Sequence, residues 1–443
     1  MKLGAWLCTA AVLALAACTP GSDNRPAQQP AGDVKTDVAA MGQVTLTIWD
    51  QETRGGQQAQ ISALNDQFQR KYPNVRINRV ARSFDDLRST IKLGLTGNDA
   101  PDIAQVNNGK QDMGAFVKAG LLRPLDAYAS AYQWTQRFPE SVRKLGSYPD
   151  TGDALGEGRL YGLPQTGELV GIYYNKPKLT ALGLQPPKTW AEFDAALAKA
   201  KSAGQLPIQV GNLEKSAGPY LFSLAMHRFG NADEESKLAT GRAGVNWPTD
   251  ANRAAARQVV EWADKGYLTP GFAGLKGDDA VSKFSTGDGV FHVDGTWITP
   301  TVKEPMKDDV GFLLPPEKDG KVTVTGGTGL PWAISSKSKN PDAAAAYIDF
   351  ITSPDAMKTV ATAGNLPVLD ADKQAASGVE RDVLDAWNKA ANSPGLVPYL
   401  DYATPNAYEV VTGSVEQLLS KQLDVEGFLG KLQADLDSSR GGR

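Results

Sequence analysis

Residues 44–50 read Val44-Thr45-Leu46-Thr47-Ile48-Trp49-Asp50, a run that is rich in β-branched residues and alternates with a period of two. Such a run predicts a β-strand. Apolar residues then recur at helical spacing over residues 61–68, and residues 75–80 alternate again as a second strand. Strand, helix and strand in this order predict a βαβ unit. A third strand is expected over residues 101–106, so we predict an α/β fold with a mostly parallel sheet.

The second half of the chain continues this alternation of strands and helices. Residues 171–174 and 207–210 are typical of short strands. Between them, Thr189 and Glu192 stand at the spacing of a capping box, which predicts a helix that ends near residue 203. A chain of 443 residues, 41% of them hydrophobic, is long enough for two or three globular domains.

The charge balance argues against a polyanionic partner. The chain carries 46 Lys and Arg residues against 50 Asp and Glu residues, a net charge of −4. This balance leaves no basic footprint of the kind that nucleic-acid-binding proteins need. We therefore expect no nucleic-acid partner.

The N-terminus has the features of an export signal. The apolar run over residues 3–17 is too short for a permanent membrane span and is typical of a signal peptide. Its end, Leu15-Ala16-Ala17-Cys18, resembles the bacterial lipobox, which implies removal of residues 1–17 and a lipid anchor on Cys18. The alternative is an ordinary secretory signal. Residues 18–42 are rich in Pro, Gly and polar residues and are predicted to be a flexible tether. The other cysteine lies inside the signal, so the mature chain is expected to have no internal disulfide.

Further short motifs follow one another across residues 43–360. They are Ala100-Pro101-Asp102-Ile103, Gly120-Leu121-Leu122-Arg123-Pro124-Leu125-Asp126, Tyr161-Gly162-Leu163-Pro164, Tyr174-Asn175-Lys176, Pro187-Lys188-Thr189-Trp190, Phe284-Ser285-Thr286-Gly287, Gly295-Thr296-Trp297, Gly326-Gly327, Ala333-Ile334 and Asn340-Pro341. Each motif alone is weak, but their order resembles that of the extracellular solute-binding proteins of bacterial ABC importers, in the branch that contains maltose-binding protein.

The resemblance implies a fold, a location and partners. The fold would be a two-lobed periplasmic-binding-protein fold (type II, Venus-flytrap), with a hinge and an interlobe ligand cleft. One lobe would contain residues 42–168 plus 309–352, and the other residues 169–308 plus 353–443. The protein would be a monomer, either anchored by lipid to the outer face of the cytoplasmic membrane or periplasmic. It would deliver its ligand to the transmembrane subunits of an ABC permease and their ATPase.

Candidate ligand-binding residues follow the predicted strands, because ligands bind beyond the carboxyl ends of strands in open α/β sheets. A neutral polyol needs planar polar side chains for its hydroxyls and flat aromatic rings for its C–H faces. Gln51 and Glu52 follow the first strand, Asn107 and Asn108 follow the third, and Asp294 follows a later one. The alternatives are a solvated loop for the first pair and a turn for the two asparagines.

The resemblance adds further candidates. Trp297 lies in a matched segment that supplies an aromatic face in relatives, although it could instead pack inside a lobe. Gln165 and Glu168 fall where the chain is expected to cross first between the lobes. Gly326-Gly327 could let backbone amides approach hydroxyls or could form a turn. Tyr402 matches a region where relatives often place a second aromatic platform.

The sequence lacks the parts of common enzymes. His227 and His292 are the only histidines, and no metalloprotease, Cys-x-x-Cys, P-loop or serine-hydrolase motif occurs. We therefore predict no catalytic residues, no metal and no cofactor, and a receptor that captures a carbohydrate, an oligosaccharide, by lobe closure. Two alternatives stay open: a glycoside-acting enzyme with a carboxylate pair, and a protein that presents its ligand to a membrane sensor. A polyamine or a glycerol phosphodiester is an alternative ligand.

Overall fold

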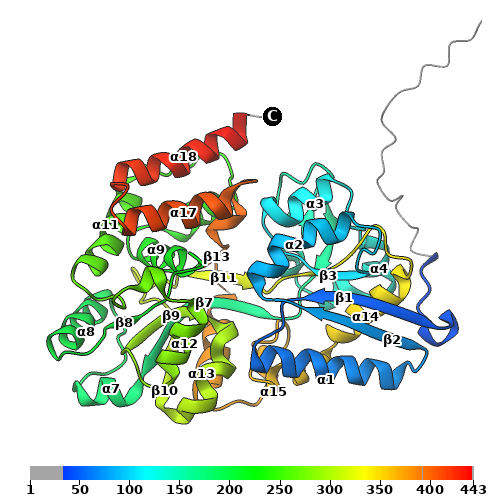
Figure 1. Cartoon of the computed structure of the whole chain (residues 1–443), viewed down its shortest axis with the longest axis horizontal. Coiled ribbons are helices and arrows are strands. Elements are labelled where there is room, and N and C mark those ends of the chain that lie inside the picture. Colours follow the sequence, from blue (N-terminus) through cyan, green and yellow to red (C-terminus); the bar gives the residue numbers. More distant parts are fainter. Residues whose placement is uncertain (1–32, 392, 442–443) are drawn as a thin grey trace, which may run out of the picture.

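The computed structural model describes residues 33–391 and 393–441. The expected signal peptide, Cys18 and most of the tether lie outside these residues. The described chain forms two lobes that lie side by side, each with its own sheet and its own helices (Figure 1).

The first lobe is built on a sheet that has five strands in the described chain, in the order β2-β1-β3-β12-β6. Strand β1 pairs in parallel with β2 and with β3, which confirms the βαβ unit predicted at the start of the domain. Strand β12 runs antiparallel to β3 and β6. The strands are β1 (Val44–Asp50), β2 (Val75–Ala81), β3 (Ile103–Gln105), β6 (Gly162–Leu163) and β12 (Trp332–Ile334), and β4 (Ser147–Tyr148) pairs with β5 (Arg159–Leu160) in a separate hairpin.

Helices cover this sheet on both faces. The side chain of Ser83 accepts a hydrogen bond from the backbone N–H of Asp86, which caps the start of α2. The helices of the first lobe are α1 (Gly55–Lys71), α2 (Phe84–Thr96), α3 (Ala115–Lys118), α4 (Asp126–Ala131), α5 (Trp134–Arg137), α6 (Glu140–Lys144), α14 (Pro341–Ile351) and α15 (Pro354–Thr362).

The second lobe is organised around β7 (Gly167–Asn175), in which every residue is buried. Strands β9 (Phe291–Gly295), β10 (Val310–Leu313) and β11 (Val324–Thr328) all pair with β7 in the antiparallel direction. The short strands β8 (Ile208–Gln209) and β13 (Leu396–Val397) pair in parallel with β9 and β11. The prediction of a mostly parallel sheet is therefore wrong for this lobe. Three of its strands run antiparallel to β7, whereas a βαβ pattern would have placed them parallel to it.

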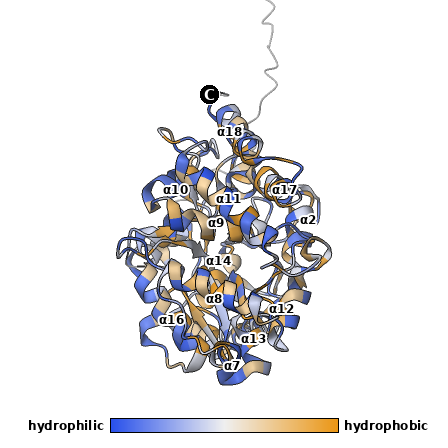
Figure 2. Cartoon of the chain, turned by 90° about the vertical axis from the view of Figure 1, so that its left-hand side faces the viewer, coloured by the Kyte–Doolittle hydropathy of each residue, from blue (hydrophilic) through white to orange (hydrophobic). Residues whose placement is uncertain are grey.

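The helices of the second lobe surround its sheet, and in Figure 2, which is coloured by hydropathy, they carry both hydrophilic and hydrophobic residues. Helix α8 begins with the predicted capping box of Thr189 and Glu192. These helices are α7 (Lys176–Ala181), α8 (Trp190–Ser202), α9 (Ala217–Phe229), α10 (Ala232–Ala239), α11 (Asp250–Asp264), α12 (Gly277–Ser285), α13 (Thr299–Met306), α16 (Gly378–Ala391), α17 (Ala407–Leu419) and α18 (Val425–Gly441). Within the described ranges, every helix is too short or too polar to span a bilayer.

Within the described residues, the chain passes between the lobes in three segments. They are residues 164–166, 329–331 and 363–370. These segments are hydrogen-bonded to one another: the N–H of Gly329 donates to the carbonyl of Thr166 (3.0 Å), and the N–H of Val368 donates to the carbonyl of Gln165 (3.2 Å). The three segments therefore form one hinge.

Two lobe boundaries differ from the expected ones. Strands β10 and β11 pair with β7, so residues 310–328 belong to the second lobe, whereas the first lobe was expected to resume at residue 309. Helix α15 packs Met357 and Val360 into the core of the first lobe, whereas the second lobe was expected to resume at residue 353. Both differences have the same cause. The lobe to which a segment belongs depends on which strand it pairs with or which core it packs into, and the local sequence pattern does not record this.

Candidate functional site

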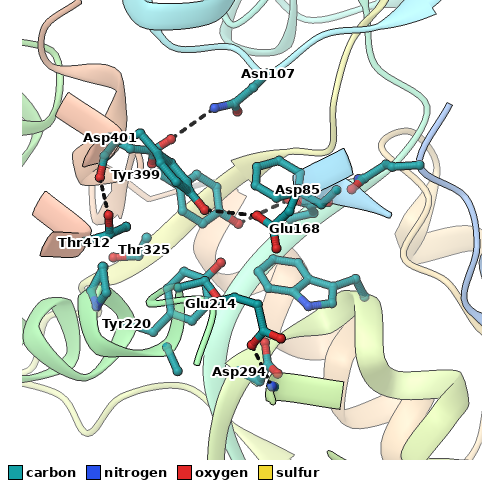
Figure 3. A pocket seen from close by; sticks show the side chains of 18 of the residues that line it. Asp85, Asn107, Glu168, Glu214, Tyr220, Asp294, Thr325, Tyr399, Asp401 and Thr412 are labelled. Carbon is teal, nitrogen blue, oxygen red and sulfur yellow. Dashed lines mark hydrogen bonds between the residues drawn. The ribbon is translucent and has the colours of Figure 1, made fainter. Parts of the chain in front are cut away.

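A cavity of about 370 Å³ lies between the two lobes and is lined by residues of both (Figure 3). The first lobe contributes the ends of β1 and β3 and the start of α2. The second lobe contributes the start of α9, the end of β9 and the segment that precedes α17. The lining residues used below are Gln51, Arg54, Gln57, Phe84, Asp85, Asn107, Glu168, Glu214, Tyr220, Lys276, Asp278, His292, Asp294, Trp297, Thr325, Tyr399, Asp401, Tyr402 and Tyr408.

The end of β1 is held in place by ion pairing and hydrogen bonding. Asp50 is fully buried and accepts two hydrogen bonds from the guanidinium of Arg79, at 2.7 and 2.6 Å. The backbone N–H of Gln51 donates to the side chain of Gln105 on β3 (2.9 Å), and Gln51 lines the cavity as expected. Glu52 does not line it: its side chain is buried and accepts a hydrogen bond from Gln105 (2.6 Å). Burial raises the pKa of Glu52 to about 7.

Of the two asparagines after β3, the structure brings Asn107 to the cavity. Its amide donates to Asp401 of the second lobe (3.1 Å) and to Asp112 of the first (3.2 Å), so it joins the lobes. Asn108 lies behind it, where its amide donates to the carbonyl of Leu145 (2.6 Å) and its oxygen accepts from Tyr402 (3.1 Å). Asn108 therefore positions Tyr402, which does line the cavity.

Glu168 and Gln165 stand close in sequence but in different surroundings. Glu168, on β7, lines the cavity and accepts a hydrogen bond from the hydroxyl of Tyr399 (3.2 Å). Burial raises the pKa of Glu168 to about 8, and the charge of Glu52 adds to this increase. Gln165 lies in the hinge instead, where it accepts from Gln60 (3.0 Å) and donates to the carbonyl of Ile351 (2.6 Å). Its polar atoms are therefore engaged by the first lobe.

The end of β9 places Asp294 and Trp297 at the cavity wall. Asp294 accepts a hydrogen bond from the N–H of Gly295 (2.7 Å) and lies 3.3 Å from the ring Nε2 of His292. Trp297 belongs to a short 3₁₀-helix, Thr296–Ile298, and its ring centroid lies 5.8 Å from that of Tyr220. The ring is half-buried, so it both packs on the lobe and presents a face to the cavity.

Gly326 and Gly327 lie in β11 and do not line the cavity. A Cβ atom on Gly326 would lie 2.3 Å from the carbonyl oxygen of Glu168. Such a contact is too close for any other residue, so this glycine allows β11 to approach β7. The two glycines thus support the strand that carries Glu168, and they are part of neither a turn nor the lining.

Sequence reasoning missed several lining residues. Tyr220 comes from the first turn of α9, and Tyr399 and Asp401 come from the segment before α17. Asp85 and Glu214 come from the start of α2 and from a loop. The sequence did contain a signal for two of these residues. In the run Tyr399-Leu400-Asp401-Tyr402, an aromatic and an acidic side chain stand next to Tyr402, which was already a candidate ligand-binding residue.

Contacts between the lobes surround the cavity. Arg54 of the first lobe pairs with Asp278 of the second (3.0 Å). On the other side, Arg88 of α2 pairs with Glu409 of α17 (3.1 Å), and its guanidinium lies 3.7 Å from the ring centroid of Tyr408. The lobes are therefore in contact on both sides of the cavity.

The model of one family matches residues 49–358, and its description is bacterial extracellular solute-binding protein. The chain belongs to this family. Membership confirms the resemblance seen in the sequence, and it makes this an exported protein. Across residues 33–391 and 393–441, no group of three or more His, Cys, Asp and Glu side chains could hold a metal ion.

Named relatives and solved structures are similar to this solute-binding protein over most of its length. A multiple sugar-binding protein of Streptococcus mutans is 22% identical over 418 residues, 91% of this chain and 94% of the relative. A maltotriose-binding protein of Pyrococcus abyssi is 25% identical over 412 residues, 90% of this chain and 83% of the relative. The structure of a chitin oligosaccharide binding protein has a TM-score of 0.78 at 23% identity and covers 90% of this chain and 100% of its own. A solute-binding protein in complex with raffinose has a TM-score of 0.70 at 19% identity and covers 89% and 99%. The two-lobed periplasmic-binding-protein fold is thereby confirmed.

Proposed function

We propose that this solute-binding protein captures a carbohydrate, an oligosaccharide, in the interlobe cavity and delivers it to an ABC permease. The observation that carries the proposal is the composition of a cavity of about 370 Å³, whose lining combines aromatic rings with planar polar side chains. Trp297, Tyr220 and Tyr402 offer flat apolar faces for sugar rings. Gln51 offers an amide group, which can both donate to and accept from hydroxyls, whereas Asn107, whose two N–H groups are already engaged, offers its amide oxygen as an acceptor.

Lobe closure supplies the mechanism. The lining is divided between the lobes, so a ligand contacts all of it only when the lobes are together. A ligand that makes these extra contacts shifts the equilibrium between open and closed forms toward the closed one. The closed form then docks on the permease, whose ATPase supplies the energy of transport. The chain itself catalyses no reaction in this scheme.

The location is part of the proposal. Residues 1–17 would be removed as a signal peptide, and Cys18 would carry the lipid that holds a monomeric receptor at the outer face of the membrane. Mass spectrometry of the membrane fraction tests this point, because a lipid on Cys18 adds the mass of a diacylglycerol to the first peptide, whereas plain secretion leaves that peptide unmodified.

A thermal-shift screen of the purified protein against mono- and oligosaccharides, polyamines and phosphodiesters tests the function. A ligand at 100 times its Kd stabilises the native state by about 2.7 kcal/mol, which raises the unfolding temperature by several degrees. A saturable shift with an oligosaccharide that is recovered intact supports the proposal. Cleavage of the sugar would favour an enzyme, and a shift with a non-carbohydrate alone would overturn the sugar assignment.

A further inference from the structure

The cavity carries far more acidic than basic side chains. Six carboxylates line it, against one arginine and one lysine. The acidic residues are Asp85, Glu168, Glu214, Asp278, Asp294 and Asp401, and the basic ones are Arg54 and Lys276. Figure 3 shows that Asp85, Glu168, Glu214 and Asp294 come from different segments and surround the same space.

The two basic side chains do not neutralise this excess. Arg54 is engaged by Asp278, to which its Nε and one terminal nitrogen donate at 3.2 and 3.0 Å. Lys276 is an exposed residue at the start of α12, where its ammonium group can be solvated. After the Arg54–Asp278 pair is set aside, five carboxyl groups remain against one exposed lysine. Glu168, whose pKa is raised to about 8, is mostly protonated at pH 6, so the negative charge there comes from the other four.

Four of the remaining carboxyl groups are held by uncharged donors. Asp85 accepts from the hydroxyl of Tyr408 (3.4 Å), and Glu214 accepts from the backbone N–H of Gly277 (3.0 Å). Glu168 and Asp401 accept from a tyrosine hydroxyl and from an asparagine amide, at 3.2 and 3.1 Å. Such partners fix the carboxyl groups in place without supplying an ion pair.

The pKa values of two carboxyl groups in the cavity reflect these surroundings. Burial raises the pKa of the Asp85 carboxyl, and the charge of Glu214 on the facing lobe raises it further. Burial also raises the pKa of Asp401 to about 6. The guanidinium of Arg88 lowers both pKa values in part, but it does not fully offset the effects of burial and of the neighbouring carboxylates. A cation placed among them would relieve the repulsion between the lobes.

Two further features of the lining accommodate a cation on a sugar. The rings of Phe84, Tyr220, Trp297, Tyr399, Tyr402 and Tyr408 line the cavity, and aromatic faces attract ammonium groups. Gln57 is buried, and its amide oxygen has no hydrogen-bond partner. This oxygen is an acceptor at the cavity wall that lacks a donor, and an ammonium group or a hydroxyl would supply one.

We propose that the ligand of this cavity is a saccharide that carries a protonated amine, with the ammonium group held among Asp85, Glu214 and Asp294. This inference rests on the proposed function, because it specifies the class of carbohydrate that the receptor takes. The hydroxyls of the ligand are bound by the amide of Gln51 and by the amide oxygen of Asn107, and its rings lie against Trp297 and its aromatic neighbours.

Matched pairs of sugars provide the test, because an amine and a hydroxyl at the same carbon differ in charge but little in shape. The purified full-length mature protein is titrated with glucosamine against glucose, with galactosamine against galactose, and with the β-1,4-linked disaccharide of glucosamine against cellobiose and the diacetylated disaccharide. Binding is measured by calorimetry and by thermal shift at pH 6, where the amines are protonated. Spermidine is included as an amine without a sugar.

We expect the amine member of at least one pair to bind about tenfold or more tightly than its hydroxyl and acetamide counterparts, because charge-assisted hydrogen bonds are about twice as strong as neutral ones. Equal or tighter binding of a neutral member would overturn this inference and leave the proposed function intact. Binding of spermidine alone would overturn the proposed function and retain the charge argument. Absence of binding by every sugar and by spermidine would count against both.

Two variants locate the ammonium site. Glu214→Gln and Asp294→Asn each keep the size and the acceptor oxygen of the side chain and remove its charge. Each should reduce the preference for the amine over its neutral counterpart about tenfold. Glu234→Gln, at an exposed position of α10 away from the cavity, is the matched control and should keep the full preference. An unchanged preference in both cavity variants would contradict the assignment.

Discussion

Replacement of Glu168 by Gln tests whether this side chain is buried and whether its negative charge lacks a nearby positive partner. Glu168 lies in the middle of the molecule, on the strand that leads out of the hinge. Tyr399 donates one hydrogen bond to it, and Glu52 lies nearby with the same charge. The substitution keeps the shape of the side chain and an oxygen that can accept from Tyr399, but it removes the ionisation.

The magnitude follows from the difference between two pKa values. The carboxyl has a pKa of 4.5 in the unfolded chain and about 8 in the folded protein. Because the folded pKa is the higher one, the native state binds more protons than the unfolded state in this window, and the free energy of unfolding falls as the pH rises. Between pH 5 and pH 9 this one group should lower the stability of the ligand-free protein by about 4 kcal/mol.

The assay is urea unfolding of the ligand-free protein and of the variant at pH 5 and pH 9. Glu168→Gln should be more stable than the parent at pH 9, and its loss of stability between the two pH values should be smaller by several kcal/mol. Glu234→Gln, which removes an exposed carboxylate from α10, is the control and should follow the parent. If the Glu168 variant loses stability with pH as steeply as the parent, then Glu168 is solvated and the inferred burial of this wall of the cavity is wrong.

Two substitutions separate ligand contact from structural support. Trp297→Ala should weaken sugar binding by about 2 kcal/mol, or roughly thirtyfold in Kd, with a small change in unfolding temperature; a large drop in that temperature with unchanged Kd would assign the ring to packing. Gln165→Leu leaves the side chain of Gln60 and the carbonyl of Ile351 without their partner and should cost about 2–4 kcal/mol of stability. Urea unfolding measures that cost, and loss of binding at unchanged stability would instead make Gln165 a ligand residue.

Local sequence pattern was sufficient for the parts of the fold that depend on neighbours in the chain. The period of two at residues 44–50 and the helical spacing that follows predicted the first βαβ unit, because a buried strand and an amphipathic helix each impose their own periodicity. The antiparallel sheet of the second lobe was not predicted. Strands β10 and β11 reach β7 from more than 130 residues away, and their pairing depends on contacts that no local pattern records.

The candidate site divides in the same way. Gln51, Asn107 and Asp294 were placed at the cavity because each follows a strand end, and strand ends meet at one edge of a sheet. Tyr220 and Glu214 were missed because they come from a helix start and a loop, whose positions depend on how the second lobe packs against the first. Gly326 was misassigned, since a glycine that approaches a ligand and one that approaches a neighbouring strand look alike in sequence.

The position of β12 has a consequence for how the protein folds. This strand lies between β3 and β6 in the first sheet, yet it follows most of the second lobe in the chain. As the chain emerges from its N-terminus, the first sheet therefore lacks a middle strand until nearly three quarters of the residues have appeared. Pairings of such long sequence separation close slowly. The N-terminal strands of the first sheet therefore stay without this partner until most of the second lobe has also been synthesised.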